Sequence, residues 1–314
     1  MGGYRHSEEA RIRNEGIPFD NTSLVVSVTV SLHVDAFTDS AFKGNPAAVC
    51  LLEEERDDGW LQSVATEFNI SVTSYLTPDN SDQTPNHPRA LLNHIVKLCG
   101  HGTLAASHTL FTSGFIDSNI IEYVTGSGVL TAKRLSSSTN STIRNDKDAK
   151  ESFLIELNFP TAPITESDTT DVSLVSKALG GATVIDIRRT IAKDDLFVVL
   201  ASAKCVADVQ PELDAIRRCP GRGIIITGVA PPESGFDFYS RFFCPKLGID
   251  EDPVCGSAHC SLALYWCKLL GKSDFVAYAA SPRGGVVDVH LDEQNQRVLL
   301  RGKASTVMTG TLLV

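Results

Sequence analysis

The residues "CGHG" at 99–102 combine a thiol, an imidazole and two glycines directly before an apolar stretch with helical spacing. The residues "CGSAHC" at 255–260 repeat the order of cysteine, glycine, small residues and apolar helix half a chain length later. A thiol at the beginning of a helix lies in the field of the helix dipole, which lowers its pKa and favours the thiolate. Both cysteines are therefore candidates for acid/base chemistry.

The first turn of a helix also binds anions such as carboxylates, because its backbone N–H groups have no partner within the helix. Two such helix ends at a common cleft would hold a carboxylate between two thiols. One thiol would remove a proton from a carbon and the other would deliver a proton to the opposite face, which inverts the stereocentre without a cofactor. The pattern predicts Cys99 and Cys255 as the acid/base pair and Gly100, Gly102, Gly256 and Ser257 as the carboxylate-binding residues.

A cysteine–histidine hydrolase is a weaker interpretation of the first motif. Cys99 and His101 are two residues apart at a turn, and this separation seldom brings a thiol and an imidazole into hydrogen-bond contact. No third residue that would orient the imidazole is evident in the sequence. We therefore do not expect these two side chains to work as a nucleophile and its base.

The fold must bring two helices half a chain length apart to one site, and an internal duplication into two similar lobes explains this simply. Helical spacing occurs over 58–68, 102–113, 171–179, 211–218 and 257–270, and Gly114 and Gly271 end the two helices that follow the cysteines. Strand-like runs occupy 23–37, 47–52, 120–135 (a hairpin), 152–159, 195–203, 223–230, 286–291, 297–302 and 305–314. Many strands, few helices and no steady alternation of the two predict an α+β fold.

Composition and charge bound the possible partners. The net charge of −10 over 314 residues argues against a nucleic acid or an anionic membrane as partner. No window reaches the length of a membrane span, and residues 1–25 lack the apolar core of a signal peptide, so we expect a cytoplasmic protein. No metal-ligand spacing and no phosphate-binding loop is present, so we expect no cofactor and a small carboxylate or amino acid as substrate.

Three segments carry a family resemblance: "DAFTDSAFKGNPAAVCLL" at 35–52, "LCGHGTLAASH" at 98–108 and "EDPVCGSAHCSLALYW" at 251–266. In order and spacing they resemble the PhzF-like (phenazine biosynthesis-like) family, including plant members. The resemblance implies the diaminopimelate epimerase fold, with two pseudo-symmetric lobes that each wrap a curved, mostly antiparallel sheet around a central helix. A homodimer is common for this fold.

The resemblance also implies a domain organisation, because the last strand of this fold returns to the first lobe. The polar segment 136–151 has no apolar periodicity and is typical of a linker. We therefore expect a flexible extension over 1–25, an N-terminal lobe over 26–135 plus 303–314, the linker at 136–151, and a C-terminal lobe over 152–302.

Several family site residues have counterparts here. The family's active-site glycine and histidine match Gly100 and His101, its acid matches Asp252, and its serine at the helix mouth matches Ser257. Cys99 and Cys255 match the positions of the two catalytic thiols of diaminopimelate epimerase. Asn45 corresponds to a loop that faces the cleft in this fold. We expect Asn45 to bind substrate, although a turn asparagine that stabilises its own backbone is an equal alternative. His101 and Asp252 are expected to bind or orient an amino group.

The chain departs from the family at the catalytic glutamate of its "N-x-S-E-T" motif, where "NISVT" at 69–73 has Val72. Glu67 is a weak candidate to replace it. Three hypotheses follow: a cofactor-independent amino-acid racemase or epimerase with two thiols, an isomerase of a cyclic or unsaturated acid that uses His101 and Asp252, and a catalytically silent binding protein on the same fold.

Overall fold

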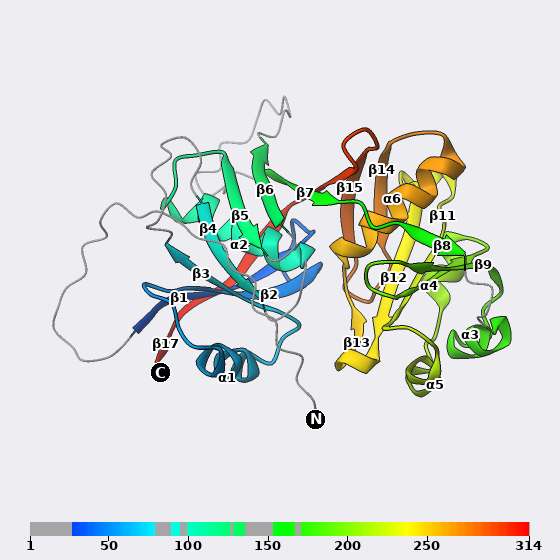
Figure 1. Cartoon of the computed structure of the whole chain (residues 1–314), viewed down its shortest axis with the longest axis horizontal. Coiled ribbons are helices and arrows are strands. Elements are labelled where there is room, and N and C mark those ends of the chain that lie inside the picture. The colour runs from blue at the N-terminus through cyan, green and yellow to red at the C-terminus, as the bar shows by residue number, and fades with distance from the viewer. Residues whose placement is uncertain are drawn as a thin grey trace. The chain divides into compact units, whose positions relative to one another are not determined.

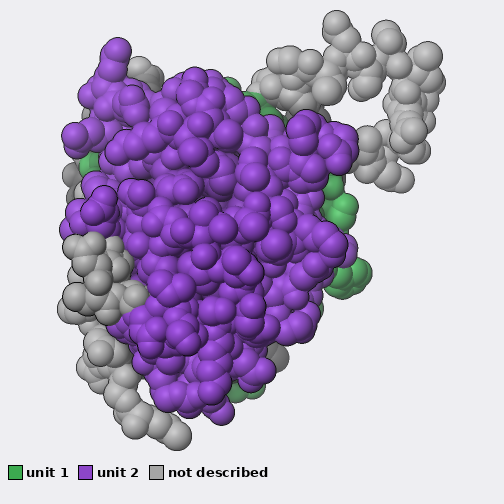
Figure 2. All heavy atoms as spheres, turned by 90° about the vertical axis from the view of Figure 1, so that its right-hand side faces the viewer, with its two compact units in different colours: residues 1–42, 46–157, 301–314 green, residues 43–45, 158–300 purple. Residues whose placement is uncertain are grey.

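The computed structural model describes residues 27–78, 89–94, 99–125, 128–135, 153–166 and 171–313. The chain divides into two compact units, shown in green and purple in Figure 2. Unit 1 comprises Met1–Phe42, Pro46–Leu157 and Arg301–Val314, and unit 2 comprises Lys43–Asn45 and Asn158–Leu300. The extension expected over 1–25 and the linker expected over 136–151 lie outside the described residues.

Unit 1 is built mainly from strands around one helix, α2 (Figure 1). Its helices are α1 (Asp58–Phe68) and α2 (Gly100–Ser113). Its strands are β1 (Ser27–Ala36), β2 (Asn45–Leu51), β3 (Thr73–Pro78), β4 (Arg89–His94), β5 (Ile120–Thr125), β6 (Gly128–Leu135) and β17 (Ala304–Leu313). The strands β7 (Leu154–Pro160) and β16 (Arg297–Gly302) pair with each other and contain residues of both units.

Unit 2 has the same kind of architecture around α6 (Gly256–Leu270). Its other helices are α3 (Val172–Ala178), α4 (Ala203–Asp208) and α5 (Leu213–Arg218), with the 3₁₀ turns η1 (Pro232–Ser234) and η2 (Pro245–Leu247). Its strands are β8 (Ile164–Glu166), β9 (Val184–Thr190), β10 (Leu196–Leu200), β11 (Ile224–Val229), β12 (Phe238–Cys244), β13 (Ile249–Asp252), β14 (Asp274–Ala279) and β15 (Gly285–Asp292).

The two units share one scheme of strand pairing. In unit 1, β2 is parallel to β3, β3 antiparallel to β4, β4 parallel to β5, and β5 antiparallel to β6. In unit 2, β10, β11, β12, β14 and β15 pair in the same parallel and antiparallel sequence. In unit 1 the central helix α2 follows β4, the third strand of its series. In unit 2 the third strand is β12; the short strand β13 pairs with it, and α6 follows β13. This repetition supports the internal duplication that the two cysteine motifs predict.

The central helices lie in the cores of their units. Helix α2 contacts β1, β3, β4, β6 and β17, and its residues Leu104, Ala105 and Leu110 are almost completely buried. Helix α6 packs on β15 and places the buried Trp266 ring parallel to that of Phe238 in β12, with 5.3 Å between ring centroids. Burial of such large side chains is the main source of stability for each unit.

The two central helices also end and begin alike. Both end at a glycine in the left-handed conformation, Gly114 at φ 75° and Gly271 at φ 66°, which the sequence predicts.

The helices α1, α3 and α4 begin at an Asp or Ser whose side chain accepts a hydrogen bond from the first turn. Helices α2 and α6 begin at Cys99 and Cys255, which make no such capping hydrogen bond. Their first turns therefore lack the usual side-chain acceptor at the N-cap.

Within the described ranges, none of the helices combines the length and the apolar character that a membrane crossing requires.

Candidate active site

The mouth of α2 brings the first thiol and the first imidazole together. Cys99 is the N-cap of α2 in an extended conformation, and its Sγ lies 3.6 Å from Nδ1 and 4.0 Å from Nε2 of His101. Both side chains are buried, each 6% exposed. The expectation that residues at this separation do not meet is therefore wrong. Cys99 stands outside the helix while His101 is already in its first turn, and the imidazole folds back over the cap.

Ser71 is a third residue that contacts the imidazole of His101. The sequence analysis did not identify it. The Ser71 hydroxyl donates to the backbone carbonyl of Pro46 at 3.1 Å, and its Oγ lies 3.3 Å from Nε2 of His101. Ser71 lies two residues before β3, next to Val72, the position at which the resemblance implies a glutamate. That position, Val72, is only 3% exposed, whereas Glu67 is exposed on α1. The "NISVT" motif contains no carboxylate, and Ser71 is the residue of this motif that contacts His101.

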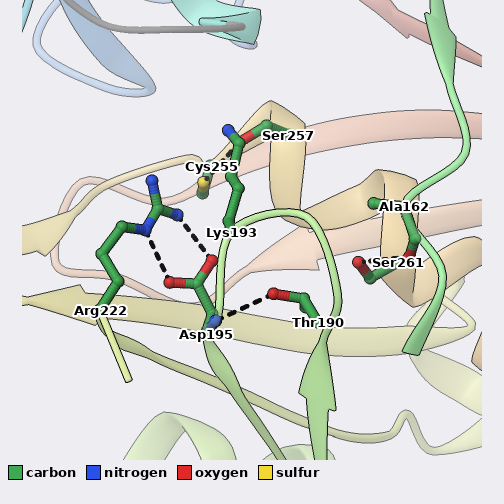
Figure 3. Close-up of polar contacts among 8 residues, drawn as sticks. All are labelled: Ala162, Thr190, Lys193, Asp195, Arg222, Cys255, Ser257 and Ser261. Carbon is green, nitrogen blue, oxygen red and sulfur yellow. Dashed lines mark hydrogen bonds and ion pairs between the residues drawn. The ribbon is translucent and has the colours of Figure 1, made fainter. Parts of the chain in front are cut away.

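The mouth of α6 is also lined by polar side chains (Figure 3). Cys255 is the N-cap, and its Sγ lies 3.5 Å from the hydroxyl of Ser257 in the first turn. Lys193, from the turn between β9 and β10, donates from its Nζ to the same hydroxyl at 3.1 Å. A cationic side chain therefore lies where the dipole of α6 already favours an anion.

The structure corrects the expected ionisation of Cys255. Burial and the negative charge of Asp252 raise the pKa of Cys255 well above its usual value, and the positive charge of Lys193 opposes them only in part. Desolvation penalises a thiolate more than the helix terminus favours it at this position. Cys255 is consequently a protonated thiol at neutral pH.

The turn that carries Lys193 is braced by a buried ion pair. Arg222 donates two hydrogen bonds to the carboxylate of Asp195, at 2.8 Å and 2.6 Å, and the Asp195 side chain is only 3% exposed. The backbone N–H of Asp195 donates to the Thr190 hydroxyl at 2.9 Å, which closes the turn (Figure 3). Both ends of the turn are therefore fixed.

Asp252 and Asn45 form one polar group within unit 2. The side-chain amide of Asn45 donates to the carboxylate of Asp252 and to the carbonyl of Val254. The Arg283 guanidinium holds the preceding segment, because it donates to the carbonyl oxygens of Gly44 at 2.8 Å and of Lys43 at 2.9 Å. Among the described residues, the Oδ1 atom of the buried Asn45 has no hydrogen-bond partner.

The residues predicted for the site thus gather in two groups, one in each unit. Cys99, Gly100, His101 and Gly102 surround the beginning of α2. Asn45, Asp252, Cys255, Gly256 and Ser257 surround the beginning of α6. The structure adds a residue to each group that sequence reasoning missed: Ser71 in unit 1 and Lys193 in unit 2. Ser71 belongs to the "NISVT" motif and could have been found there, whereas no motif marks Lys193.

Metal ligation has no evident place in these groups. Over the described part of the chain, no three or more His, Cys, Asp or Glu side chains are arranged to hold a metal ion.

Comparison with known proteins shows which family the chain resembles. A family model described as phenazine biosynthesis-like protein (PhzC-PhzF) matches residues 34–310. A Halalkalibacterium halodurans protein named as an uncharacterized isomerase is 37% identical over 287 residues, which cover 90% of this chain and 97% of the relative. The human phenazine biosynthesis-like domain-containing protein is 35% identical over 295 residues, covering 88% of this chain and 96% of the relative.

A solved structure agrees with the sequence relatives. The crystal structure of a PhzF family protein from Enterococcus faecalis aligns with a TM-score of 0.74 and 30% identity, covering 92% of this chain and all of the other. The fold is accordingly the α+β, diaminopimelate epimerase-like fold that the resemblance implies, with a mostly antiparallel sheet around a central helix in each unit. The chain belongs to the phenazine biosynthesis-like (PhzF) family.

Proposed function

We propose that the protein is a cofactor-independent isomerase that inverts a stereocentre of an amino acid, with Cys99 and Cys255 as its acid/base pair. The observation that carries the proposal is the repeated placement of a cysteine at the N-cap of each central helix, where its side chain makes no capping bond. The isomerase class is supported by relatives from Halalkalibacterium halodurans and Pseudomonas aeruginosa, 37% and 34% identical, that are named isomerases.

Cys99 is assigned the role of the base that removes the α-proton. Its Sγ lies 3.6 Å from Nδ1 of His101, so the imidazole can take the proton of the thiol. The resulting thiolate is the stronger nucleophile and base of the two sulfur species. Cys99 is the N-cap of α2, so its sulfur lies beside the backbone N–H groups of the first turn.

Cys255 is assigned the role of the acid that delivers a proton to the opposite face. Burial and the charge of Asp252 raise its pKa, so it carries a proton at neutral pH. The two thiols therefore differ in their surroundings, as the two halves of a proton-transfer pair must. In one turnover the Cys99 thiolate gains the substrate proton and the Cys255 thiol loses its own. Both return to the starting state by proton exchange with solvent.

Binding of the substrate is assigned to the two helix mouths. The first-turn amides around Gly100 and Gly102, and around Gly256 and Ser257, would hold the α-carboxylate. Lys193, at 3.1 Å from the Ser257 hydroxyl, adds positive charge to the second of these. Asp252 and His101 would bind and orient the amino group, with Asn45 fixing the carboxylate of Asp252 through its amide hydrogen bond.

The test is the loss of inversion in single cysteine variants. We expect Cys99→Ala and Cys255→Ala each to lower the inversion rate by about 10²–10⁴, the usual contribution of a general acid or base. Cys267→Ala is the matched control, because Cys267 lies at the other end of α6 and faces Glu293. Inversion of amino-acid enantiomers is followed by chiral chromatography. Full activity of Cys255→Ala would contradict the two-thiol mechanism.

A second candidate is the isomerisation of a cyclic or unsaturated acid by His101 and Asp252. What supports it is that the chain belongs to the family and that the resemblance assigns His101, Asp252 and Ser257 to the family's site. This function requires a replacement for the missing glutamate. It predicts that Val72→Glu raises activity on such an acid, and an unchanged rate in this variant would count against it.

A further inference from the structure

We propose that Lys193 is a positioning residue for Cys255: through the hydroxyl of Ser257 it stabilises the thiolate that Cys255 becomes when it gives its proton to the substrate. This inference deepens the proposed function and rests on its assignment of Cys255 as the acid. It concerns three side chains of unit 2, two from the beginning of α6 and one from the turn between β9 and β10 (Figure 3).

The two contacts of the Ser257 hydroxyl have a single direction of hydrogen bonding once the thiolate has formed. The ammonium group of Lys193 has only donors, whatever else it contacts, so the Ser257 Oγ accepts from it at 3.1 Å. A thiolate has no proton, so the hydrogen bond across the 3.5 Å between Oγ and the Cys255 Sγ has the Ser257 hydroxyl as its donor. Both hydrogen bonds of this chain therefore point toward the negative charge.

A chain with this direction favours the thiolate more than Ser257 would alone. A hydroxyl that accepts a hydrogen bond from a cation becomes a stronger donor, because hydrogen bonds in a chain polarise one another. A hydrogen bond to a charged acceptor is also stronger than one between neutral groups, so the same contact contributes less while the sulfur holds its proton. The chain thus stabilises Cys255 in the state that follows proton transfer, which is the state whose stabilisation speeds the reaction.

Three charged groups act on the sulfur of Cys255. The carboxylate of Asp252 in β13 raises the pKa of the thiol, and the ammonium group of Lys193 lowers it. The guanidinium group of Arg222 also interacts with this sulfur, but it donates two hydrogen bonds to the carboxylate of Asp195. Lys193 is the cation among them that contacts the hydroxyl beside the thiol.

The turn that carries Lys193 is closed by backbone hydrogen bonds. The N–H of Thr190 donates to the carbonyl of Asp195 at 2.9 Å, and the N–H of Asp194 donates to the carbonyl of Thr190 at 3.0 Å. From outside the turn, the backbone N–H of Arg222 donates to the carbonyl of Asp194 at 2.9 Å. Because the backbone on both sides is fixed, Lys193 has only its own side chain to order when it donates to the hydroxyl.

The test measures the ionisation of Cys255 and needs no substrate. Iodoacetamide alkylates the thiolate, and Cys255 is partly exposed, so its alkylation can be followed between pH 7.5 and 9.5 by tandem mass spectrometry. We expect Lys193→Met to slow it about tenfold at each pH, the effect of one hydrogen bond to a charged group. Lys204→Met is the matched control, because it removes the same charge from an exposed lysine of unit 2 that pairs with Asp208, and its rate should equal that of the wild type.

Two further variants separate positioning from a general loss of structure. Lys193→Arg keeps the charge and the N–H donors, so it should recover most of the rate. Ser257→Ala removes the middle of the chain, so adding Lys193→Met to it should slow alkylation by much less than tenfold. A wild-type rate in Lys193→Met, the same slow rate in Lys193→Arg, or a full tenfold further loss in the double variant would overturn the inference. Because alkylation does not depend on turnover, the two-thiol proposal keeps its own test in the inversion assay.

Discussion

Protonation of His259 affects the stability of the N-terminus of α6. The ring lies on α6, and its Nδ1–H donates to the carbonyl oxygen of Cys255 at 2.9 Å. Its Nε2 has no hydrogen-bond partner in the described part of the chain, and the residue is 1% exposed. Burial lowers the pKa of His259 from 6.5 to about 4. The folded protein therefore holds this histidine neutral well below the pH at which the unfolded chain protonates it.

A pH-dependent loss of stability follows from this depressed pKa. Above pH 6.5 both states hold a neutral histidine, whereas between pH 6.5 and 4 the unfolded chain alone binds the proton, so stability falls as the pH falls. The loss over this range is roughly 3 kcal/mol. We expect His259→Asn, which keeps a donor for the Cys255 carbonyl, to be less stable at neutral pH but to show a flatter pH dependence.

Urea unfolding between pH 7 and 4.5 measures the difference. The chain has two tryptophans, Trp60 in unit 1 and Trp266 in unit 2, so a Trp60→Phe background reports on unit 2 alone. Carboxylates elsewhere titrate in both proteins and cancel in the comparison. Identical slopes of stability against pH for the two proteins would rule out the role of His259.

The contacts between single side chains in the site could be predicted only in part from the sequence. The repeated Cys-Gly motif correctly marks the N-caps of both central helices. The Cys99–His101 contact depends on the backbone at the cap and on one side-chain rotamer, which spacing does not define. Lys193 reaches Ser257 from a turn 64 residues away in sequence, and the desolvation of Cys255 depends on the packed surroundings.

At the scale of elements, Arg241 ties together three segments of unit 2. From β12 it donates two hydrogen bonds to the carboxylate of Glu251 in β13, at 2.7 Å and 2.9 Å. It also donates to the carbonyl of Val209 at the end of α4, at 2.7 Å. The Arg241 side chain is 7% exposed, so these bonds form away from water. Because β13 ends at Asp252, this contact supports the site directly.

Removing this arginine should destabilise unit 2. Arg241→Met leaves the Glu251 carboxylate buried without its partner, and breaking a buried pair in this way costs about 3–5 kcal/mol. The double variant Arg241→Met/Glu251→Met removes both charges and should recover part of that loss. Urea unfolding monitored by Trp266 fluorescence in the Trp60→Phe background gives both values. A single variant as stable as its parent would show that the pair does not hold these elements together.

Helices and strands differ in how well the sequence predicts them. The predicted helix 58–68 coincides with α1, because Asp57 caps its first turn and the apolar residues repeat at helical spacing. The strand β12 escaped prediction, since it is buried on both faces and shows no alternation of polar and apolar residues. The strand β9 was missed as well, because its sequence "VIDIRRT" is interrupted by charges that lie in ion pairs.

At the scale of the whole molecule, duplication explains why one chain has two equivalent helix mouths. The strands of the two units pair in the same order of parallel and antiparallel contacts. In the amino-acid sequence, the clearest sign of the duplication is the repeated motif Cys99-Gly100 and Cys255-Gly256. After duplication each copy could change separately. The unit 1 cysteine has an imidazole beside it, and the unit 2 cysteine has an acid and a lysine. The proposed function uses this difference, because inversion needs a base and an acid at once.

Exchange of the Cα proton with solvent tests the central claim most directly. The reduced protein is incubated in D₂O with a panel of L- and D-amino acids, and the α-proton signal is followed by NMR beside the double variant Cys99→Ala/Cys255→Ala. The two-thiol mechanism predicts that the wild type replaces the α-proton of at least one amino acid with deuterium and forms its enantiomer, whereas the double variant does neither. No exchange with any amino acid, or the same exchange in the double variant, would contradict it.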